Sequence, residues 1–290
     1  MKRVVILGRG YIGSYLKYRI GQSVDVHAFS RSELDYHNTS IFDNMLANIR
    51  PDLVISAFGF TGKPNVDQAE VMKNECWHLN VNVPLAVAMA CSEKHIPLTH
   101  ISSGCIFSGY ENAWGVDDDP NFGMFDHSSF YSKTKHAFEM VSKTLPVNIV
   151  RIRMPFSGCS SSRNYIMKLL RYDRLIDCVN SKTCVEDAAD VINAMIQDGS
   201  LLQNNRRQII HVVNPEPMST SQVAGLINEF MPKRRKWSFV QEWQLELAAP
   251  RSNCVLHASS HEATRNMPTE YESMKRCISM LARISEKEMG

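Results

Sequence analysis

The chain has 290 residues, of which 44% are hydrophobic, and a formal net charge of +2 at pH 7, so it can bury a sizeable core but lacks the excess positive charge of a general nucleic-acid-binding surface. Its eight cysteines include no CxxC pair, and Met1-Lys-Arg is followed by only four apolar residues. We therefore expect reduced thiols, a cytoplasmic protein without a signal peptide or membrane span, and no metal site.

The first predicted elements are a strand over residues 4–7, a glycine-rich turn, and a helix over residues 14–20. The spacing GxGxxG directly after an apolar run is typical of a dinucleotide-binding turn, in which backbone N–H groups and the helix N-terminus face the pyrophosphate. Outside this context the same pattern could be a flexible loop. The glycines and the expected N–H donors are Gly8, Gly10, Gly13, Tyr11 and Ile12.

The second predicted strand, residues 25–29, leads into Ser30 and Arg31. NAD sites usually place a carboxylate at about this position for the ribose 2′-hydroxyl, whereas a 2′-phosphate calls for arginine. Because no acid stands at the strand end, Ser30 and Arg31 favour NADPH. The alternative is a solvated arginine, with Glu33 or Asp35 recognising the ribose.

Strands and helices then alternate, which predicts an α/β fold with a doubly wound parallel sheet and ligands at the carboxyl ends of the strands. Ala57, Phe58 and Gly59 follow the third strand and are expected along the adenosine side of the coenzyme. The predicted strands are residues 53–57, 97–102 and 147–151, and the predicted helices are residues 41–49, 74–94 and 128–145.

Tyr131 and Lys135 lie four residues apart in the last of these helices, so they share one face. A lysine near a tyrosine stabilises the phenolate and lowers the phenol pKa from about 10, which suits proton exchange with a carbonyl oxygen. Ser103, at a strand end, is expected to donate a hydrogen bond to the same oxygen. An amphipathic surface pair and a serine bonded to nearby backbone are the alternatives that these residues leave open.

Beyond Pro155 the regular alternation fades into turns, two helical stretches, a strand over residues 208–213 and a helix over residues 273–284. We expect a nucleotide-binding domain over residues 1–155 and a smaller substrate domain over residues 156–290, with the chain around residues 180–215 returning to the first domain.

Two further side chains suit acid–base chemistry. Because strand side chains alternate, Cys105 is expected on the same side as Ser103, where a thiol can exchange protons. A helix over residues 163–171, capped near Ser161 or Ser162, would place Lys168 one turn from Asn164. A buried space-filling cysteine and a surface lysine are the alternatives.

Taken together, the glycine turn, the serine, the YxxxK pair and the βα units resemble the extended short-chain dehydrogenases/reductases, and within them the dTDP-4-dehydrorhamnose reductase group. The sequence is most similar to the UDP-4-keto-6-deoxyglucose 3,5-epimerase/4-reductases of UDP-rhamnose synthesis, such as the C-terminal half of plant rhamnose synthase. The stretches that carry this resemblance are residues 103–107 (SGCIF), 119–122 (DPNF), 130–135 (FYSKTK), 151–155 (RIRMP), 163–164 (RN) and 249–253 (APRSN).

The resemblance implies an NADPH-dependent enzyme that forms UDP-L-rhamnose by two epimerisations and one reduction. It assigns reduction to Ser103, Tyr131 and Lys135, and epimerisation to Cys105 with Lys168. Inversion needs proton donors and acceptors on both faces of the sugar, and which residue is the acid or the base stays open. The residues expected to bind the nucleotide sugar are Arg163, Asn164, Arg251 and Asn253.

Other functions within and beyond this group remain alternatives. A dTDP-4-dehydrorhamnose reductase or a GDP-fucose-synthase-like epimerase/reductase would use the same catalytic groups on another nucleotide. A dinucleotide-binding regulatory subunit of a synthetase would bind coenzyme without turning over a sugar. The resemblance also leads us to expect a homodimer, and the low net charge and the lack of a long apolar run lead us to expect no nucleic-acid or membrane partner.

Overall fold

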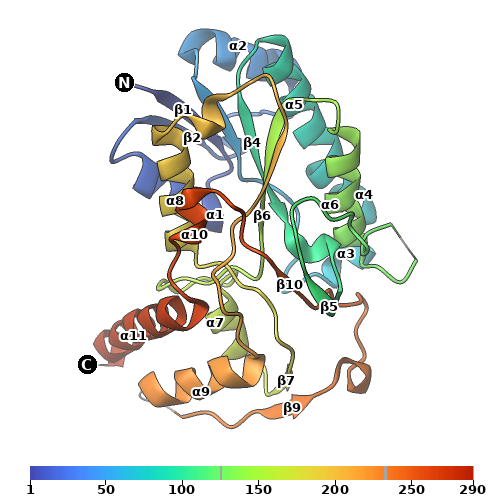
Figure 1. Ribbon diagram of the computed structural model, residues 1–290, viewed down its shortest axis with the longest axis vertical. Helices are drawn as coiled ribbons and strands as arrows, with labels where there is room; N and C mark the ends of the chain where they lie inside the picture. The colour runs from blue at the N-terminus through green and yellow to red at the C-terminus, as the bar shows by residue number, and fades with distance from the viewer. Residues whose placement is uncertain (125, 232–233, 290) are drawn as a thin grey trace.

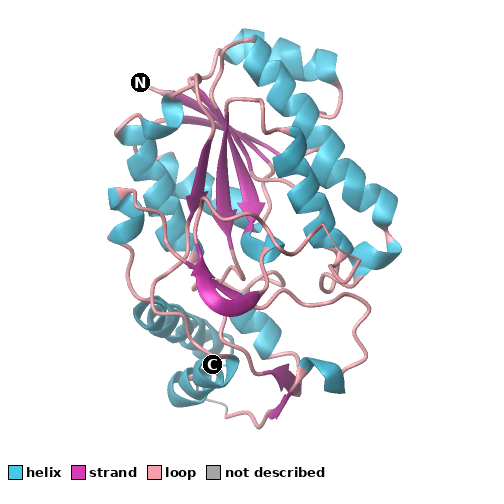
Figure 2. Cartoon of the chain, turned by 45° about the vertical axis from the view of Figure 1, so that its right-hand side comes forward, coloured by secondary structure: helices cyan, strands magenta, loops and turns pink. Residues whose placement is uncertain are grey.

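A central sheet of six parallel strands lies between two layers of helices in the computed structural model, which describes residues 1–124, 126–231 and 234–289 (Figures 1 and 2). The strand order is β2-β1-β3-β4-β6-β8. The predicted doubly wound α/β fold is therefore confirmed. The strands are β1 (Arg3–Leu7), β2 (Asp25–Phe29), β3 (Leu53–Ser56), β4 (Leu98–Ser103), β6 (Val147–Ile152) and β8 (Gln208–His211).

Continuous apolar runs explain why these strands are central. Val4 to Leu7 in β1 and Leu53 to Ile55 in β3 have no exposed surface, as parallel strands covered on both faces require. Leu16 of α1 and Ile192 of α8 cover one face, whereas Phe42 of α2 and Phe138 of α6 cover the other. The helices of these two layers are α1 (Tyr11–Ile20) and α8 (Val185–Gln197), and α2 (Thr39–Ile49), α5 (Val83–Glu93) and α6 (Phe130–Val141).

The sheet reverses its winding between β1 and β3. Leu7 at the end of β1 pairs with Phe29 of β2 on one side and with Ser56 of β3 on the other. A crevice therefore forms at the carboxyl ends of β1 and β3, between the chain segments that follow these two strands. Open α/β sheets bind their ligands in such a crevice.

A second core forms from later parts of the chain, beyond the ends of the strand arrows (Figure 2). It includes Phe156, Leu169, Val223 and Ile278. In contrast, α8 packs on the large sheet, and β8 pairs with β6 within it. The elements around this core are α7 (Tyr165–Leu169), α9 (Thr220–Phe230), α11 (Glu270–Met289) and the pair β7 (Arg174–Ile176) and β9 (Ser238–Val240).

Short elements complete the fold. A two-stranded sheet of β5 (Gly109–Trp114) and β10 (Cys254–Leu256) brings the chain near residue 253 to the end of β4. The helix expected over residues 74–94 is interrupted by a π-helical turn. The remaining elements are α3 (Gln68–Val71), α4 (Lys73–Trp77), α10 (Glu262–Arg265), the π-helix η1 (His78–Asn82) and the 3₁₀ turns η2 (Gly104–Ile106), η3 (Ser200–Leu202) and η4 (Glu242–Gln244).

Candidate active site

The glycine turn after β1 has the shape that a dinucleotide requires. Gly8 has φ +98°, and a Cβ there would lie 2.8 Å from the Phe58 nitrogen. A Cβ on Gly13 would lie 1.8 Å from the Gly8 oxygen, whereas one on Gly10 would meet nothing within 4 Å. The first and third glycines are therefore needed for close packing, and the second borders the open space through which a pyrophosphate can approach the backbone.

Helix α1 begins at Tyr11 with no side-chain cap on its first N–H groups. These N–H groups, which include those of Tyr11 and Ile12, are thus free to bind an anion. The Tyr11 hydroxyl donates to the Ser157 Oγ at 2.7 Å, which ties the turn to the chain after β6. Burial raises the pKa of Tyr11, although the Ser157 bond opposes this effect.

After the end of β2, Glu33 contacts Ser30, one of the two predicted phosphate-binding residues. The carboxylate of Glu33 accepts hydrogen bonds from the Ser30 backbone N–H at 2.8 Å and from its Oγ at 2.7 Å, and it pairs with Arg9. These Ser30 bonds, with the nearby Arg9 charge, hold the pKa of Glu33 at about 2. Arg31 is exposed and has no ion-pair partner among the described residues.

Ser103, Tyr131 and Lys135 meet at the carboxyl end of β4. Ser103 and Lys135 are buried and Tyr131 is half-buried, and a hydrogen bond joins Ser103 to Tyr131. The Lys135 Nζ lies 6.0 Å from the centre of the Tyr131 ring. A Cβ on Gly59 would lie 3.4 Å from the same nitrogen, so the chain after β3 borders this group directly.

The expected direction of the Tyr131 pKa shift is wrong. Burial raises the pKa of Tyr131, the Cys105 sulfur adds to the rise, and Ser103 and Arg163 only partly oppose it. Burial also lowers the pKa of Lys135 to about 8. Desolvation therefore outweighs the attraction between ammonium and phenolate that the YxxxK spacing suggested.

Cys105 and Lys168 lie in the same electrostatic neighbourhood. Burial, followed by Arg163, lowers the pKa of Lys168, and the Cys105 sulfur raises it. The alternation argument for Cys105 is wrong, because β4 ends at Ser103 and Cys105 lies in η2. The Cys105 N–H donates to the Ser103 Oγ at 3.2 Å, and this local bond closes the turn.

The helix that carries Lys168 also differs from the prediction. Helix α7 spans Tyr165–Leu169 and its N-cap is Asn164, not Ser161 or Ser162. The Asn164 Oδ1 accepts from the Ile166 N–H at 3.0 Å, and its Nδ2 donates to the Ser157 oxygen at 2.8 Å. Asn164 is fully buried, so in this structure its amide stabilises the chain instead of facing a ligand.

The remaining predicted substrate residues are held by polar partners. Arg163 donates to the Thr61 Oγ1 at 2.5 Å. Arg251 donates to both carboxylate oxygens of Asp67, at 2.6 and 3.1 Å, and its charge affects Lys168. The Asn253 Nδ2 donates to Glu242 at 3.1 Å. Two guanidinium groups thus border the loop after β3.

Asn80, Asp67 and Arg153 are site residues that the sequence did not indicate. In the π-helical turn, the Asn80 Oδ1 accepts from the Phe60 N–H at 2.8 Å and its Nδ2 donates to the Thr134 Oγ1 at 3.0 Å, which joins the loop after β3 to α6. No local sequence pattern predicts a contact between residues so far apart in the chain. Arg153 belongs to residues 151–155, which carry the resemblance, but nothing in that stretch indicates that its side chain is buried.

The fold also groups three potential metal ligands that are distant in the sequence. Cys184 lies 3.8 Å from Cys277, sulfur to sulfur, and 3.3 Å from a Glu186 oxygen. The Arg276 guanidinium donates to the Cys184 sulfur at 3.4 Å. Because this cation disfavours a second positive charge, we assign no metal to the cluster.

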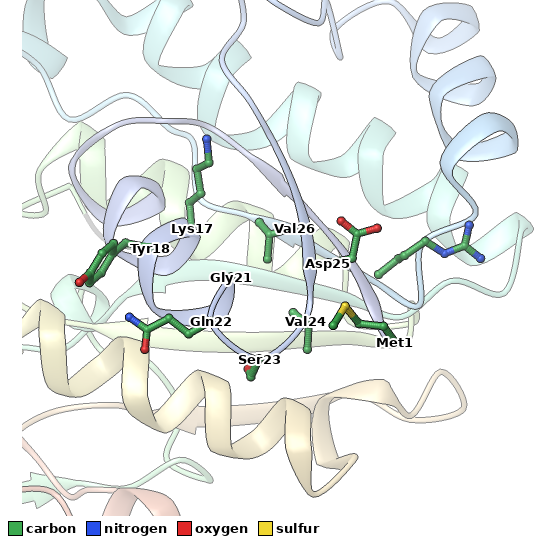
Figure 3. Close-up of a pocket in the computed structure, with 10 residues that line it drawn as sticks. Met1, Lys17, Tyr18, Gly21, Gln22, Ser23, Val24, Asp25 and Val26 are labelled. Atoms are coloured by element: carbon green, nitrogen blue, oxygen red, sulfur yellow. The ribbon is translucent and has the colours of Figure 1, made fainter.

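A surface pocket of about 640 Å³ lies at the other end of the sheet (Figure 3). Lys17, Tyr18, Gln22 and Asp25 help to line it, near the end of α1 and the start of β2. None of the predicted site residues is among its lining residues, so we do not connect it with the active site.

Within the part of the chain that the structure describes, the helices are too short or too polar to cross a lipid bilayer.

Known proteins similar to this chain form nucleotide sugars. The bifunctional dTDP-4-dehydrorhamnose 3,5-epimerase/dTDP-4-dehydrorhamnose reductase of Arabidopsis thaliana is 31% identical over 261 residues, which cover 86% of this chain and 83% of that protein. The trifunctional UDP-glucose 4,6-dehydratase/UDP-4-keto-6-deoxy-D-glucose 3,5-epimerase/UDP-4-keto-L-rhamnose-reductase RHM3 of the same plant is 29% identical, and the match covers 87% of this chain and 38% of that protein.

A solved structure agrees with these relatives. The crystal structure of the L780 UDP-rhamnose synthase from Acanthamoeba polyphaga mimivirus superimposes with a TM-score of 0.84 at 26% identity, covering 96% of this chain and 99% of that one. The RmlD substrate binding domain model matches residues 1–282. The resemblance found in the sequence is thus confirmed, and the chain belongs to the RmlD substrate binding domain family.

Proposed function

We propose that this protein is an NADPH-dependent epimerase/reductase that converts UDP-4-keto-6-deoxyglucose to UDP-L-rhamnose. The observation that carries the proposal is the convergence of Ser103, Tyr131 and Lys135 with Cys105 and Lys168 beside the dinucleotide turn. The similarity to the mimivirus UDP-rhamnose synthase and to the plant epimerase/reductases supports the same reaction.

The coenzyme fits the glycine turn, because the open side of Gly10 and the free N–H groups of α1 suit a pyrophosphate. Arg31 is the available cation for a 2′-phosphate. Glu33 already binds the neighbouring Ser30, so the choice between NADPH and NADH is a point to test. Bound NADPH would supply hydride to the sugar C4.

For the reduction, Tyr131 donates a proton to the C4 oxygen and Ser103 donates a hydrogen bond to it. The raised pKa of Tyr131 keeps the phenol protonated at neutral pH, which is the form a proton donor requires. Lys135 supplies a positive charge beside the oxygen that becomes negative.

For the epimerisations, the C4 ketone makes the protons at C3 and C5 acidic. Ser103 and Tyr131 stabilise the enolate oxygen, while Cys105 and Lys168 exchange protons on opposite faces of the ring. Arg163 and Arg251 offer planar cations to the diphosphate, with Asn253 nearby and Asn164 holding α7 in place.

A dTDP-linked substrate is the second candidate, because the Arabidopsis relative at 31% identity is named for that nucleotide. We would supply UDP-, dTDP- and GDP-linked 4-keto-6-deoxy sugars with NADPH or NADH, and identify the products by NMR. UDP-L-rhamnose as the preferred product supports the proposal. Turnover of only a dTDP- or GDP-linked sugar would assign the enzyme to that nucleotide instead. Coenzyme binding without turnover of any sugar would favour a regulatory subunit.

Variants at the two epimerisation residues test the roles within the reaction. In Cys105→Ser and Lys168→Ala we expect reduction at C4 to continue and inversion at C3 or C5 to be lost. Unchanged product stereochemistry in both variants would remove these residues from the scheme.

We infer that the enzyme works in the cytoplasm, since all eight cysteines are unpaired in the structure. We also infer a homodimer without nucleic-acid or membrane partners. Light scattering on the purified protein tests the dimer directly.

A further inference from the structure

Arg153 is a buried cation without an acidic partner. It follows β6, is 1% exposed, and has no carboxylate oxygen within 4 Å among the described residues. The two other fully buried cations of this region differ, because Arg151 pairs with Glu139 at 2.6 Å and Lys182 pairs with Glu270 at 2.7 Å. A buried charge without a counterion is costly, so a nearby anion is needed.

The Arg153 guanidinium is locked in place by neutral groups. Its Nη1 donates to the Gly104 oxygen at 3.2 Å and to the Ser252 Oγ at 2.8 Å, and its Nη2 donates to Asn180 and to the Ser252 carbonyl. Its Nε has no hydrogen-bond partner in the described part of the chain. These bonds fix the charge directly behind η2 and leave it unneutralised.

The nearest group that can become an anion is Cys105. Its sulfur lies 3.9 Å from the Arg153 Nη1, the same atom that holds the Gly104 carbonyl. Cys105 is a half-buried residue, so its side chain is not closed off from a substrate. The charge of Arg153 also acts on Cys254, but Cys254 is fully buried, and this burial raises its pKa.

The other groups around Cys105 favour a negative sulfur as well. The titratable side chains that interact electrostatically with it include Lys135 and Lys168, which are cationic, and Tyr131 and Cys254, which are neutral when protonated. Three positive charges, counting Arg153, therefore surround one thiol.

We propose that Arg153 is the counterion of a Cys105 thiolate, so that Cys105 is the base and Lys168 the acid of the epimerisations. This pairing rests on the proposed function and adds to it the residue that keeps the sulfur charged. Arg153 does not touch the sugar in this scheme and acts as a positioning residue through the sulfur.

The proton balance follows from the assignment. The thiolate takes the proton from C3 or C5, the C–H electron pair moves into the enolate, and the negative charge rests on the C4 oxygen beside Tyr131 and Ser103. The Lys168 ammonium then returns a proton to the opposite face of the same carbon. Cys105 is left as a thiol and Lys168 as an amine, and solvent exchange restores both before the second inversion.

The test measures the reactivity of Cys105 toward iodoacetamide without any sugar, using peptide mass spectrometry to read this cysteine alone. Only the thiolate reacts, so an ordinary thiol gains about fiftyfold in rate between pH 6.5 and 8.5. In the wild-type protein we expect less than about a threefold change over this range.

Variants connect the effect to the guanidinium. In Arg153→Met we expect the rate at pH 6.5 to fall at least about tenfold and the steep pH dependence to return, whereas Arg153→Lys retains most of the reactivity. The matched control is Arg207→Met, another arginine with an unpartnered Nε, whose charge acts near Glu139 and Arg151. It should leave Cys105 unchanged.

A steep pH dependence in the wild-type protein would overturn the proposal even if Arg153→Met does not fold. Equal rates in Arg153→Met and Arg207→Met would also overturn it. Because no sugar is present, a reactive Cys105 combined with a lack of rhamnose product would refute the proposed function and leave the Arg153–Cys105 pair intact.

Discussion

Burial sets the protonation states of the two functional residues on α6. It raises the pKa of Tyr131, so the phenol is neutral at pH 7, and it lowers the pKa of Lys135 to about 8, so the ammonium is still mostly charged there. The pair therefore consists of a proton donor beside a cation, and the cation is the group that titrates near neutral pH.

The first prediction concerns pH. The kcat/KM for NADPH reports groups of the free enzyme, and Lys135 holds its charge below its pKa of about 8 and loses it above. We expect kcat/KM to be level below about pH 8 and to fall about tenfold per unit at higher pH. Lys135→Arg, which stays charged, should show no such fall relative to its own maximum. A wild-type profile that is level to pH 9.5 contradicts the assignment.

The second prediction concerns the stability cost of the same charge. The pKa of Lys135 drops from 10.5 to about 8 on folding, because burial disfavours the ammonium. Lys135→Met should therefore raise the free energy of unfolding by about 1–3 kcal/mol at pH 7, and lower kcat at least about a hundredfold.

The pH dependence of this stability difference gives a second readout. Below pH 8 the folded wild-type protein carries the buried charge, so the difference is full. As pH rises from 8 toward the unfolded value of 10.5, the folded state loses its proton first and the difference disappears. Urea unfolding at pH 7 gives the full difference, and at pH 10 most of it should be lost. A less stable variant at pH 7 would refute the prediction.

At the scale of elements, strands and helices followed from local patterns, while the contacts between them did not. The strand over residues 25–29 has the predicted bounds, because its alternation of polar residues with Val26 and Ala28 is typical of a strand. The η2 turn was missed, since it depends on one bond from the Cys105 N–H to Ser103. The predicted cap of α7 is wrong, because the side chain of Asn164, and not that of Ser161 or Ser162, accepts the hydrogen bond from the first turn of the helix.

Contacts between side chains of distant elements cannot be predicted from local sequence patterns. Asp67 and Arg251 lie 184 residues apart, and Arg153 and Cys105 lie 48 apart, so neither pair shares a helix face or a strand. The sequence named Cys105 and Arg251 as site residues, but it included Arg153 only within residues 151–155 and did not indicate Asp67 at all. Their partners become visible only when the loops after β3, β4 and β6 are brought to one edge of the sheet.

The third prediction compares two glycines of one turn. A Cβ on Gly13 would clash with the Gly8 oxygen at 1.8 Å, so Gly13→Ala should lower the melting temperature by about 4 °C or more. A Cβ on Gly10 meets nothing within 4 Å, so Gly10→Ala should fold normally but weaken NADPH binding at least about tenfold.

Thermal unfolding and coenzyme titration of the two variants distinguish a structural from a binding role. Normal NADPH affinity in Gly10→Ala would show that the pyrophosphate does not approach at this residue, and the assignment of the turn would then fail.

At the scale of the whole molecule, the second core is joined to the rest by buried polar contacts. Lys182 donates to Glu270 at 2.7 Å and to the Met218 carbonyl at 2.7 Å, and neither charged side chain is exposed. Glu270 also accepts from the Met218 N–H at 3.1 Å. One carboxylate at the start of α11 thus connects the segment before α8 with the segment before α9.

The last prediction tests this connection. Burial raises the pKa of Glu270 and lowers that of Lys182, which shows that desolvation exceeds the attraction within the pair. Removing one partner leaves the other charge buried and unpaired, so Glu270→Gln should lower the free energy of unfolding by about 3–5 kcal/mol. In the exposed pair of Arg235 and Asp173, Asp173→Asn should cost less than about 1 kcal/mol. Similar urea midpoints for the two variants would show that the protein does not depend on this buried pair, because the neutral amide would then satisfy the Lys182 ammonium as well as the carboxylate does.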